Sequence, residues 1–196
     1  SAAMAEIKIG TSLPLTGAFS IAGAKHEQGY KLCVDMINER GGISGEQVEL
    51  IMSDNRSDPA TAIAQYERFI NVDGVDAVFG TFSSRLTFPV ANILAKNGFV
   101  HPIPAGGALR IYTQGHKNLF YFQPNAAEYV GSSLQGLIAD LVDVADRPTT
   151  AAVVSADDFF ANAVETGFLG KKVMDPATGG EVADLAPGYL ADAGIE

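Results

Sequence analysis

The chain has 196 residues, which is enough to bury a sizeable core without disulfides or a structural metal. Hydrophobic residues make up 47% of it and charged residues 18%, and it contains no apolar run of the length that a spanning helix needs, so the composition is that of a globular protein. The 13 Lys and Arg against 23 Asp and Glu give a net charge of −10, which argues against nucleic acid and against an anionic membrane surface as partners.

The first part of the chain predicts strands and helices in strict alternation. The strands are expected at residues 6–12, 48–52, 75–79 and 99–103, and the helices at about 23–40, 60–71 and 86–97. Helical spacing of Tyr30, Cys33, Val34 and Ile37 marks the apolar face of the first helix, and we expect Cys33 in the core there. With right-handed crossovers, this β-α-β-α-β-α-β order predicts an α/β fold with an open, doubly wound parallel sheet.

A second series begins after a crossing segment at Leu119–Pro124. A helix is expected at about 129–144, a strand at 150–155 and a further helix from about Phe160. The Arg147-Pro148 break separates this series from the first. We therefore expect a domain boundary near residue 124, with residues 6–124 and 125–196 on its two sides.

Both ends of the sequence differ from those of a complete domain. The run Asp175–Gly180 interrupts the last helix, and Ala193–Glu196 resembles a helix exit without a following strand. A second sheet of one or two strands is too small to bury its helices, so we expect a fragment of a longer chain. The run Ser1–Met4 lacks an apolar region and resembles a cloning remnant, so the missing signal peptide does not indicate a cytoplasmic protein.

The loop Thr81–Arg85 places hydroxyl groups at the start of a helix, after a buried strand. Ligands of open parallel sheets bind beyond the carboxyl ends of the strands, and the N–H groups of a helix N-terminus attract an anion. This pattern favours Ser83 and Ser84 as ligands of an anion. A plain N-cap is the alternative, and both hold if one serine caps and the other points outward.

The loop after the fourth strand, residues 104–108, contains the pair Gly106-Gly107 after Ala105. Paired glycines allow positive φ angles and expose backbone N–H and C=O groups, although a tight strand–helix turn explains them equally. Both loops are expected on the same edge of the sheet. Together they favour a small ligand that carries a carboxylate.

Catalytic and metal-binding patterns are weak in this sequence. His26, His101 and His116 do not have metal-ligand spacing, one Cys excludes an intrachain disulfide and a Cys-based zinc site, and we expect no metal and no cofactor. We expect His101 to be a satisfied core or rim histidine. Asp54 and Asp58 precede a helix and are expected to cap it. There is no Gly-x-Ser-x-Gly elbow.

Four stretches and the loop after the fourth strand, taken together, resemble the leucine/isoleucine/valine-binding protein family, the type I periplasmic solute receptors of ABC importers. They are Ile7–Gly17 (IKIGTSLPLTG), Ile37–Gly45 (INERGGISG), Ser53–Ala60 (SDNRSDPA), Gly80–Pro89 (GTFSSRLTFP) and the Pro104–Ala108 loop. The resemblance covers roughly residues 6–174. It implies two doubly wound lobes joined by a hinge, with the ligand closed between them, and a chain about twice as long.

The resemblance also implies ligand-binding residues. Ser84 matches the serine that binds the ligand's α-carboxylate, and Ser83 sits beside it. Ala105 matches the residue whose carbonyl accepts from the ligand ammonium. The further positions implied are Gly106 and Gly107 in the same loop, Phe160 across the cleft, and Phe19 in the loop that roofs the pocket.

Departures from the family pattern affect the ammonium side of the site. The family often has an aspartate where this chain has Ala127, next to Glu128, and a threonine where it has Gly107. A buried ammonium without an acid costs several kcal/mol. These changes, with Phe159, Phe160 and Tyr129 nearby in sequence, suit a carboxylate with an apolar or aromatic body; alternatively Glu128, or an acid elsewhere, supplies the charge.

The function expected from this resemblance is that of a non-enzymatic receptor, and its expected partners are a small carboxylate and the membrane permease of an ABC transporter. It would be a periplasmic monomer in which the second lobe closes about crossings near Pro124. One alternative is a cytoplasmic sensor of an amide or similar small molecule on the same fold. Another is a small α/β enzyme that uses Ser84 with His101 as its base.

Overall fold

The computed structural model describes residues 6–129, 131–170, 173–174, 180–182 and 188–195. In chain order its strands and α-helices are β1 Glu6–Leu13, α1 Ser20–Glu39, β2 Gln47–Asp54, α2 Pro59–Arg68, β3 Ala77–Phe79, α3 Ser84–Lys96, β4 His101–Ile103, β5 Leu119–Tyr121, α4 Gly131–Leu141, α5 Phe159–Leu169, β6 Val173–Met174, β7 Glu181–Val182 and α6 Tyr189–Asp192. The chain forms two compact units. The first runs to Gly106 and includes His116–Phe122, and the second comprises Gly107–Gly115 and the residues from Gln123 onward.

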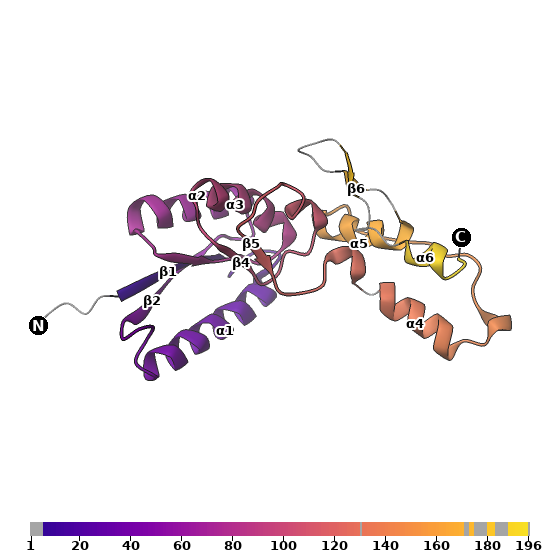
Figure 1. Cartoon of the computed structure of the whole chain (residues 1–196), viewed down its shortest axis with the longest axis horizontal. Coiled ribbons are helices and arrows are strands. Elements are labelled where there is room, and N and C mark those ends of the chain that lie inside the picture. Colours follow the sequence, from indigo (N-terminus) through magenta and orange to yellow (C-terminus); the bar gives the residue numbers. More distant parts are fainter. Residues whose placement is uncertain (1–5, 130, 171–172, 175–179, 183–187, 196) are drawn as a thin grey trace, which may run out of the picture. The chain divides into compact units, whose positions relative to one another are not determined.

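The first unit is built on a parallel sheet with the strand order β2-β1-β3. β1 pairs along its whole length with β2, from Glu6 opposite Gln47 to Leu13 opposite Asp54. Helix α1 lies on one face of this sheet, and α2 and α3 lie on the other (Figure 1). Parallel strands with crossover helices on both faces confirm the predicted doubly wound α/β fold.

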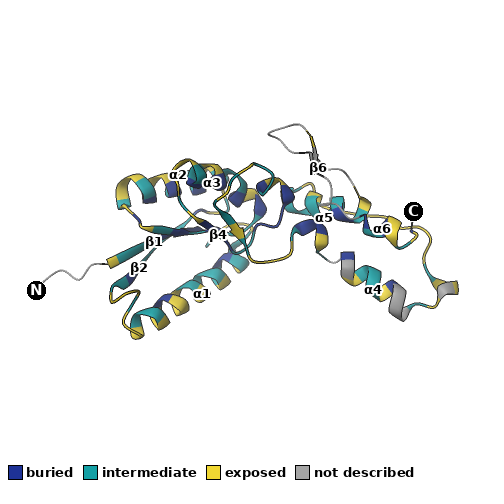
Figure 2. Ribbon diagram, viewed as in Figure 1, coloured by how far each residue is buried: buried dark blue, intermediate teal, exposed yellow. Residues whose placement is uncertain are grey.

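Each face of the sheet has its own apolar core. On the α2 and α3 side the buried members include Tyr66, Phe69, Val78 and Leu94. On the α1 side Ile9 packs with Val34 and Val48. Figure 2 colours the ribbon by burial, with buried residues in dark blue. The apolar residues of β1 thus meet helices on both sides, which explains why this strand is buried from Ile9 onward.

Helix α1 corrects one prediction about the core. Cys33 is exposed, whereas its neighbour Val34 is buried against the sheet. Successive helical residues are rotated by about 100°, so Cys33 lies to the side of the face that Val34 presents. The helix also begins at Ser20, three residues earlier than the spacing predicted.

β4 runs beside the end of β3 and pairs in parallel with β5 in a second, two-stranded sheet. The amide of Gly80 donates to the carbonyl of Pro102 at 2.9 Å, which joins the two segments. The segment 119–124 was predicted only as a crossing, but its first three residues form β5. A strand of three residues is too short for its periodicity to be recognised in the sequence.

The second unit contains α4, α5 and α6, with Ile138, Leu190 and Ile195 in a small core. The helix predicted at 129–144 is shorter in the structure, where α4 is preceded by a 3₁₀ turn at Ala126–Glu128 and followed by a 3₁₀ turn at Val144–Asp146. Helix α5 confirms the helix predicted from about Phe160.

The predicted strand at 150–155 is wrong. These residues have no regular secondary structure, they are all exposed, and Val154 is 95% exposed. Four consecutive apolar residues favour a strand locally, but a strand forms only when a neighbouring strand takes up its backbone hydrogen bonds. Most of the predicted interruption at 175–180 lies outside the described residues. Within the described part of the chain, no helix is long and apolar enough to cross a membrane.

Candidate functional site

Two loops of the first unit meet at the carboxyl edge of its strands. Phe82, which follows β3, forms a parallel bridge with Ala105, which follows β4. The close approach of these segments depends on Gly80, since a Cβ atom there would lie 2.7 Å from the carbonyl oxygen of Pro102. The two loops singled out in the sequence are therefore neighbours in the structure.

Ser83 and Ser84 have different positions at the start of α3. Ser83 is the N-cap: it has a φ of 80°, and its Oγ accepts from the amide of Leu86 at 3.3 Å. Ser84 is the first helical residue and is only 1% exposed. The amides of Ser84 and Arg85 belong to the first turn, which has no acceptors within the helix, and this turn carries a partial positive charge. The N-terminal end of α3, with its partial positive charge, therefore lies at the edge of the sheet beside Ala105.

Gly106 is held by close packing with α3. A Cβ atom at this position would lie 3.1 Å from Thr87 Oγ1 and 3.1 Å from Ile103 Cγ2. The φ angle of Gly106 is not positive, so a glycine is not required at this position for its backbone conformation. The absent side chain instead lets the loop after β4 lie directly on the first turns of α3.

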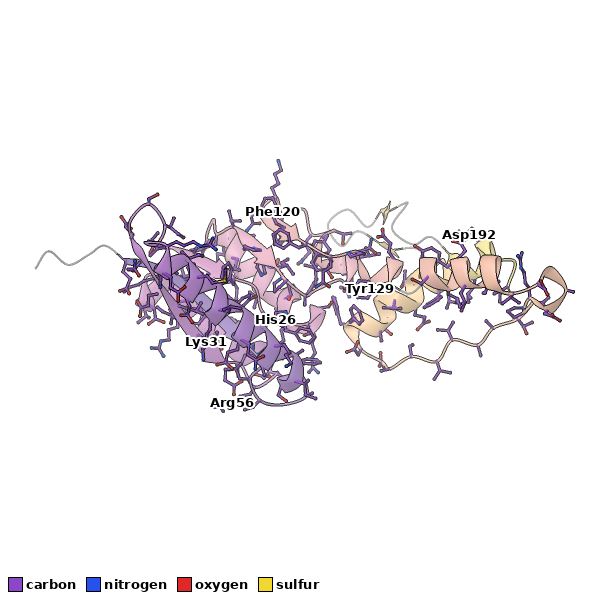
Figure 3. All side chains as sticks on the ribbon, turned by 90° about the horizontal axis from the view of Figure 1, so that it is seen from below. His26, Lys31, Arg56, Phe120, Tyr129 and Asp192 are labelled. Carbon is purple, nitrogen blue, oxygen red and sulfur yellow. The ribbon has the colours of Figure 1, made fainter. Side chains whose placement is uncertain are left out.

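Half-buried rings form a chain along α1 and β3 that includes the predicted residue Phe19. The centroid distances are 5.9 Å for Phe19–Phe82, 5.4 Å for Phe82–His26, 6.1 Å for His26–Tyr30 and 5.0 Å for Tyr30–Phe79. Figure 3 marks His26 on α1. Sequence reasoning missed all of these rings except Phe19. The i, i+4 spacing of His26 and Tyr30 on the predicted helix, about two and three turns after Phe19, was the available signal.

The acidic residues of the loop after β2 do different things. Asp58 caps α2 as predicted, and its hydrogen bonds with Thr61 lower the pKa of its carboxyl. Asp54 does not cap this helix. Its carboxylate accepts from the amides of Leu15, Thr16 and Arg56 at 2.8–3.1 Å, and from the Thr16 hydroxyl at 2.7 Å.

Partial burial raises the pKa of the Asp54 carboxyl, whereas the hydrogen bonds together lower it by more. The pKa of Asp54 therefore lies below its ordinary value. A charged acceptor with several backbone donors fixes the loop that follows β1. Asp54 therefore holds the loop that leads to Phe19, which the sequence did not reveal because the donors are 38 to 39 residues away.

The three histidines have different surroundings. His101 is buried as expected, but neither ring nitrogen has a hydrogen-bond partner among the described residues, so it is not the satisfied histidine that we predicted. The Ser84–His101 pair that a hydrolytic enzyme would need is thus not made here. His116 lies within 2.9 Å of Asn92 Oδ1. Within the described part of the chain, no three His, Cys, Asp or Glu residues gather as metal ligands would.

In the second unit a 3₁₀ turn holds two of the predicted positions. The carbonyl of Gly107 accepts from the amide of Ala126 at 2.7 Å. The Tyr129 ring, at the end of this turn, contacts the Phe160 ring at a centroid distance of 5.5 Å. Asp158 caps α5 by accepting from the amides of Phe160 and Ala161. Gly107 and Phe160 are thus both anchored near the segment 126–129.

The same turn contains Ala127, the position where the family often has an aspartate. Ala127 is 1% exposed, and α5 covers it so closely that a Cβ at Gly167 would lie 1.9 Å from its carbonyl oxygen. Glu128 accepts from Asn125 Nδ2 at 2.7 Å and is exposed. Elsewhere in the second unit, the guanidinium carbon of Arg110 lies 5.8 Å from the centre of the Phe159 ring.

Comparisons with known proteins agree with this geometry. The sequence profile of the family described as periplasmic binding protein matches residues 6–187. A Leu/Ile/Val-binding protein homolog 1 of Brucella abortus is 32% identical over 118 residues, which are 60% of this chain and 32% of that protein. The chain thus spans about a third of the length of the curated relatives that it matches.

Two solved structures show the same fold. One is the branched-chain amino acid transporter substrate-binding protein LivJ of Streptococcus pneumoniae in complex with isoleucine, with a TM-score of 0.65, 27% identity and coverage of 70% of this chain and 39% of that chain. The other is a solute-binding protein of an ABC transporter of Rhodopseudomonas palustris in complex with 3,4-dihydroxybenzoic acid, with a TM-score of 0.69, 17% identity and coverage of 82% and 42%. At that identity the second likeness concerns the fold alone.

The family profile covers most of the sequence, and the parallel sheet with its helices on both faces is the one found in these structures. Members of this family are substrate-binding proteins. The chain therefore belongs to the family of periplasmic binding proteins, and its fold is the type I fold of that family.

Proposed function

We propose that this protein is the solute receptor of an ABC importer and that it binds a small carboxylate between two lobes. The observation that carries the proposal is the start of α3, where the capped first turn lies beside the Phe82–Ala105 bridge. Backbone N–H groups at a helix start are suited to an anion. The net charge of −10 repels an anion over longer distances, so recognition has to rest on such local donors.

The proposed ligand residues belong to both units. In the first, Ser84 and the adjacent Ser83 would bind the carboxylate, with Ala105 and Gly106 lining the same edge and Phe19 above it. In the second, Gly107 would donate its N–H, and Phe160 would contact the ligand body. Each group has a structural support described above, which is what preorganised binding requires.

The ring clusters favour a ligand with an apolar or aromatic body. Phe19, Phe82 and His26 form one cluster in the first unit, and Tyr129 and Phe160 form another in the second. We therefore propose a hydrophobic amino acid or an aromatic or aliphatic acid as the ligand. Because Ala127 provides no carboxylate to pair with a ligand ammonium, carboxylic acids that lack an amino group are favoured as ligands.

The remaining parts of the proposal follow from the family. The protein would bind without transforming its ligand, would work outside the cytoplasm as a monomer, and would deliver the ligand to a membrane permease. Residues 6–124 would be the first part of the ligand-binding lobe, and residues 125–196 would begin the second lobe. Closure about the crossing near Pro124 would be the signal to the permease.

A thermal-shift screen of the intact protein tests this proposal. The panel holds branched-chain and aromatic amino acids, aromatic carboxylates, keto acids and small amides. A ligand at about 100 times its Kd should add about 2.7 kcal/mol to the free energy of unfolding. We expect Ser84→Ala to bind about tenfold more weakly, so at the same concentration it should gain about 1.3 kcal/mol less.

Ser133→Ala is the matched control, since it removes an exposed hydroxyl from α4. It should respond to ligand as the unmodified protein does. A panel in which no carboxylate shifts the unmodified protein would refute the proposed function. Equal shifts for Ser84→Ala and the unmodified protein would refute the role of Ser84.

A further inference from the structure

The loop after β2 buries a complete amide, that of Asn55, which is 0% exposed. Its Nδ2 donates to Ser12 Oγ at 3.0 Å and to Thr81 Oγ1 at 3.1 Å, and its Oδ1 accepts from the amide of Ser57 at 3.0 Å. These partners lie at the end of β1, after β3 and in the loop after β2. One side chain therefore joins three segments of the first unit at the edge that carries the proposed ligand residues.

The orientation of this amide is fixed by a further bond. The Ser12 hydroxyl donates to Gln65 Oε1 at 2.7 Å, and Gln65 Nε2 donates to the carbonyl of Asp54 at 2.8 Å. Because the proton of Ser12 is directed to Gln65, its oxygen accepts from Asn55 and the Asn55 nitrogen must face it. A buried network in which the amide donors and acceptor are matched holds its members in a single arrangement.

The segments that Asn55 joins lead directly to the proposed site. Thr81 precedes Phe82 and Ser83, and Ser12 is the penultimate residue of β1, which is followed by the loop that leads to Phe19. The Nδ2 and Oδ1 atoms of Asn55 already bond Ser12, Thr81 and Ser57, so Asn55 offers no atom to a ligand in this arrangement. Its effect on binding has to act through the two loops.

We infer that Asn55 is a positioning residue, which holds the loop after β1 and the loop after β3 at a fixed separation before a ligand binds. This role rests on the proposed function for its importance, but the holding of the loops can be measured without a ligand. Preorganised loops lose less conformational entropy on binding. Loss of the Asn55 hydrogen bonds should therefore weaken ligand affinity even where the protein stays folded.

Asn55→Asp tests the inference with almost no change of shape. The acceptor for the Ser57 amide remains, but the donor to Ser12 and Thr81 becomes an acceptor that faces two oxygens. Thr81→Val is a second variant, which removes only the hydrogen bond between Asn55 Nδ2 and the Thr81 hydroxyl and adds no charge. The matched control is Asn97→Asp, because Asn97 is exposed and its Nδ2 makes one local bond, to the carbonyl of Ile93 at 2.8 Å.

Amide hydrogen exchange of the intact proteins is the first readout. In Asn55→Asp and Thr81→Val we expect amide exchange to become about tenfold faster in residues 12–19 and 80–86. Exchange should stay unchanged in β2 and in the C-terminal half of α3. Asn97→Asp should leave both loops unchanged. Uniformly faster exchange through the unit, or loops that exchange as in the unmodified protein, would overturn the inference.

Ligand affinity is the second readout, measured at a temperature where every variant is folded. Any acid that binds the unmodified protein should bind Asn55→Asp about tenfold more weakly and Asn97→Asp equally well. Equal affinity for Asn55→Asp would overturn the positioning role. If no acid binds the unmodified protein, the proposed function fails, and the exchange result alone then decides whether Asn55 holds the loops.

Discussion

His101 shows at the scale of one residue how burial changes chemistry. Burial, with a smaller contribution from nearby His116, lowers the pKa of His101 to about 4. The unfolded chain has an ordinary histidine pKa of about 6.5, so between about pH 6.5 and 4 it binds a proton that the folded chain does not. The stability that neutral His101 contributes is therefore complete above about pH 6.5 and is lost as the pH falls toward 4.

We predict a pH dependence that one substitution removes. Between pH 7.5 and pH 5, His101 alone should lower the free energy of unfolding by about 2 kcal/mol, because folding opposes its protonation. His101→Phe should lack this part of the pH dependence, as measured by urea unfolding at both pH values. His116→Gln is the control and should retain most of it, since His116 is the minor cause of the lowered pKa. A His101→Phe protein with an unchanged slope would contradict this account.

Ser83 and Ser84 mark what sequence alone could decide about single residues. The pattern of two serines at a helix start predicted that one would be the cap, and Ser83 is. The choice between them depends on the φ of 80° at Ser83, which the turn after β3 imposes and which no local pattern records. Their proposed role in binding stays a prediction.

At the scale of elements, two tyrosines attach helices to the end of β3 from opposite faces. Tyr66 of α2 is fully buried, and its hydroxyl donates to the carbonyl of Phe79 at 2.5 Å. Tyr30 of α1 is half-buried, and its hydroxyl donates to the carbonyl of Gly80 at 3.2 Å. Burial raises the pKa of both phenols well above the ordinary value, so both remain neutral donors over the physiological range.

This pair predicts an order of stability losses. Tyr66→Phe should cost about 1–3 kcal/mol, because it removes the hydrogen bond that a fully buried tyrosine donates to the carbonyl of Phe79. Tyr30→Phe should cost less, because Tyr30 itself is only half-buried and its hydrogen bond, at 3.2 Å, is longer. Urea unfolding of both variants at pH 7 measures the difference. A larger loss for Tyr30→Phe than for Tyr66→Phe would contradict the assignment of the buried bond.

The elements that sequence predicted are those with a strong local signal. Alternation and apolar runs located β1, β2 and β3, and helical spacing located α1, α2, α3 and α5. The errors occurred where partners decide the outcome. Residues 150–155 have strand-like composition but no neighbouring strand, whereas Leu119–Tyr121 is a strand because β4 pairs with it. Local periodicity contains no information on pairing.

At the scale of the whole molecule, the candidate site depends on contacts between distant segments. Strand order predicted that the loops at 81–85 and 104–108 share one edge of the sheet, and the bridge between Phe82 and Ala105 brings them together there. The ring cluster of Phe82 with His26, and the hydrogen bonds of Asp54 and Asn55, join segments 26 to 56 residues apart and have no sequence pattern of their own. Sequence therefore located the edge of the site but not the residues that hold it in place.

The central claim is that a carboxylate is recognised at this edge. The most direct measurement is calorimetric titration of the intact protein with the tightest-binding acid of the panel and with the primary amide of the same body. The two compounds differ in charge at one group, and charge-assisted hydrogen bonds are about twice as strong as neutral ones. We predict that the acid binds at least about tenfold more tightly, a difference of about 1.4 kcal/mol. An amide that binds as tightly as the acid, or more tightly, would contradict the account and would favour a sensor of neutral amides.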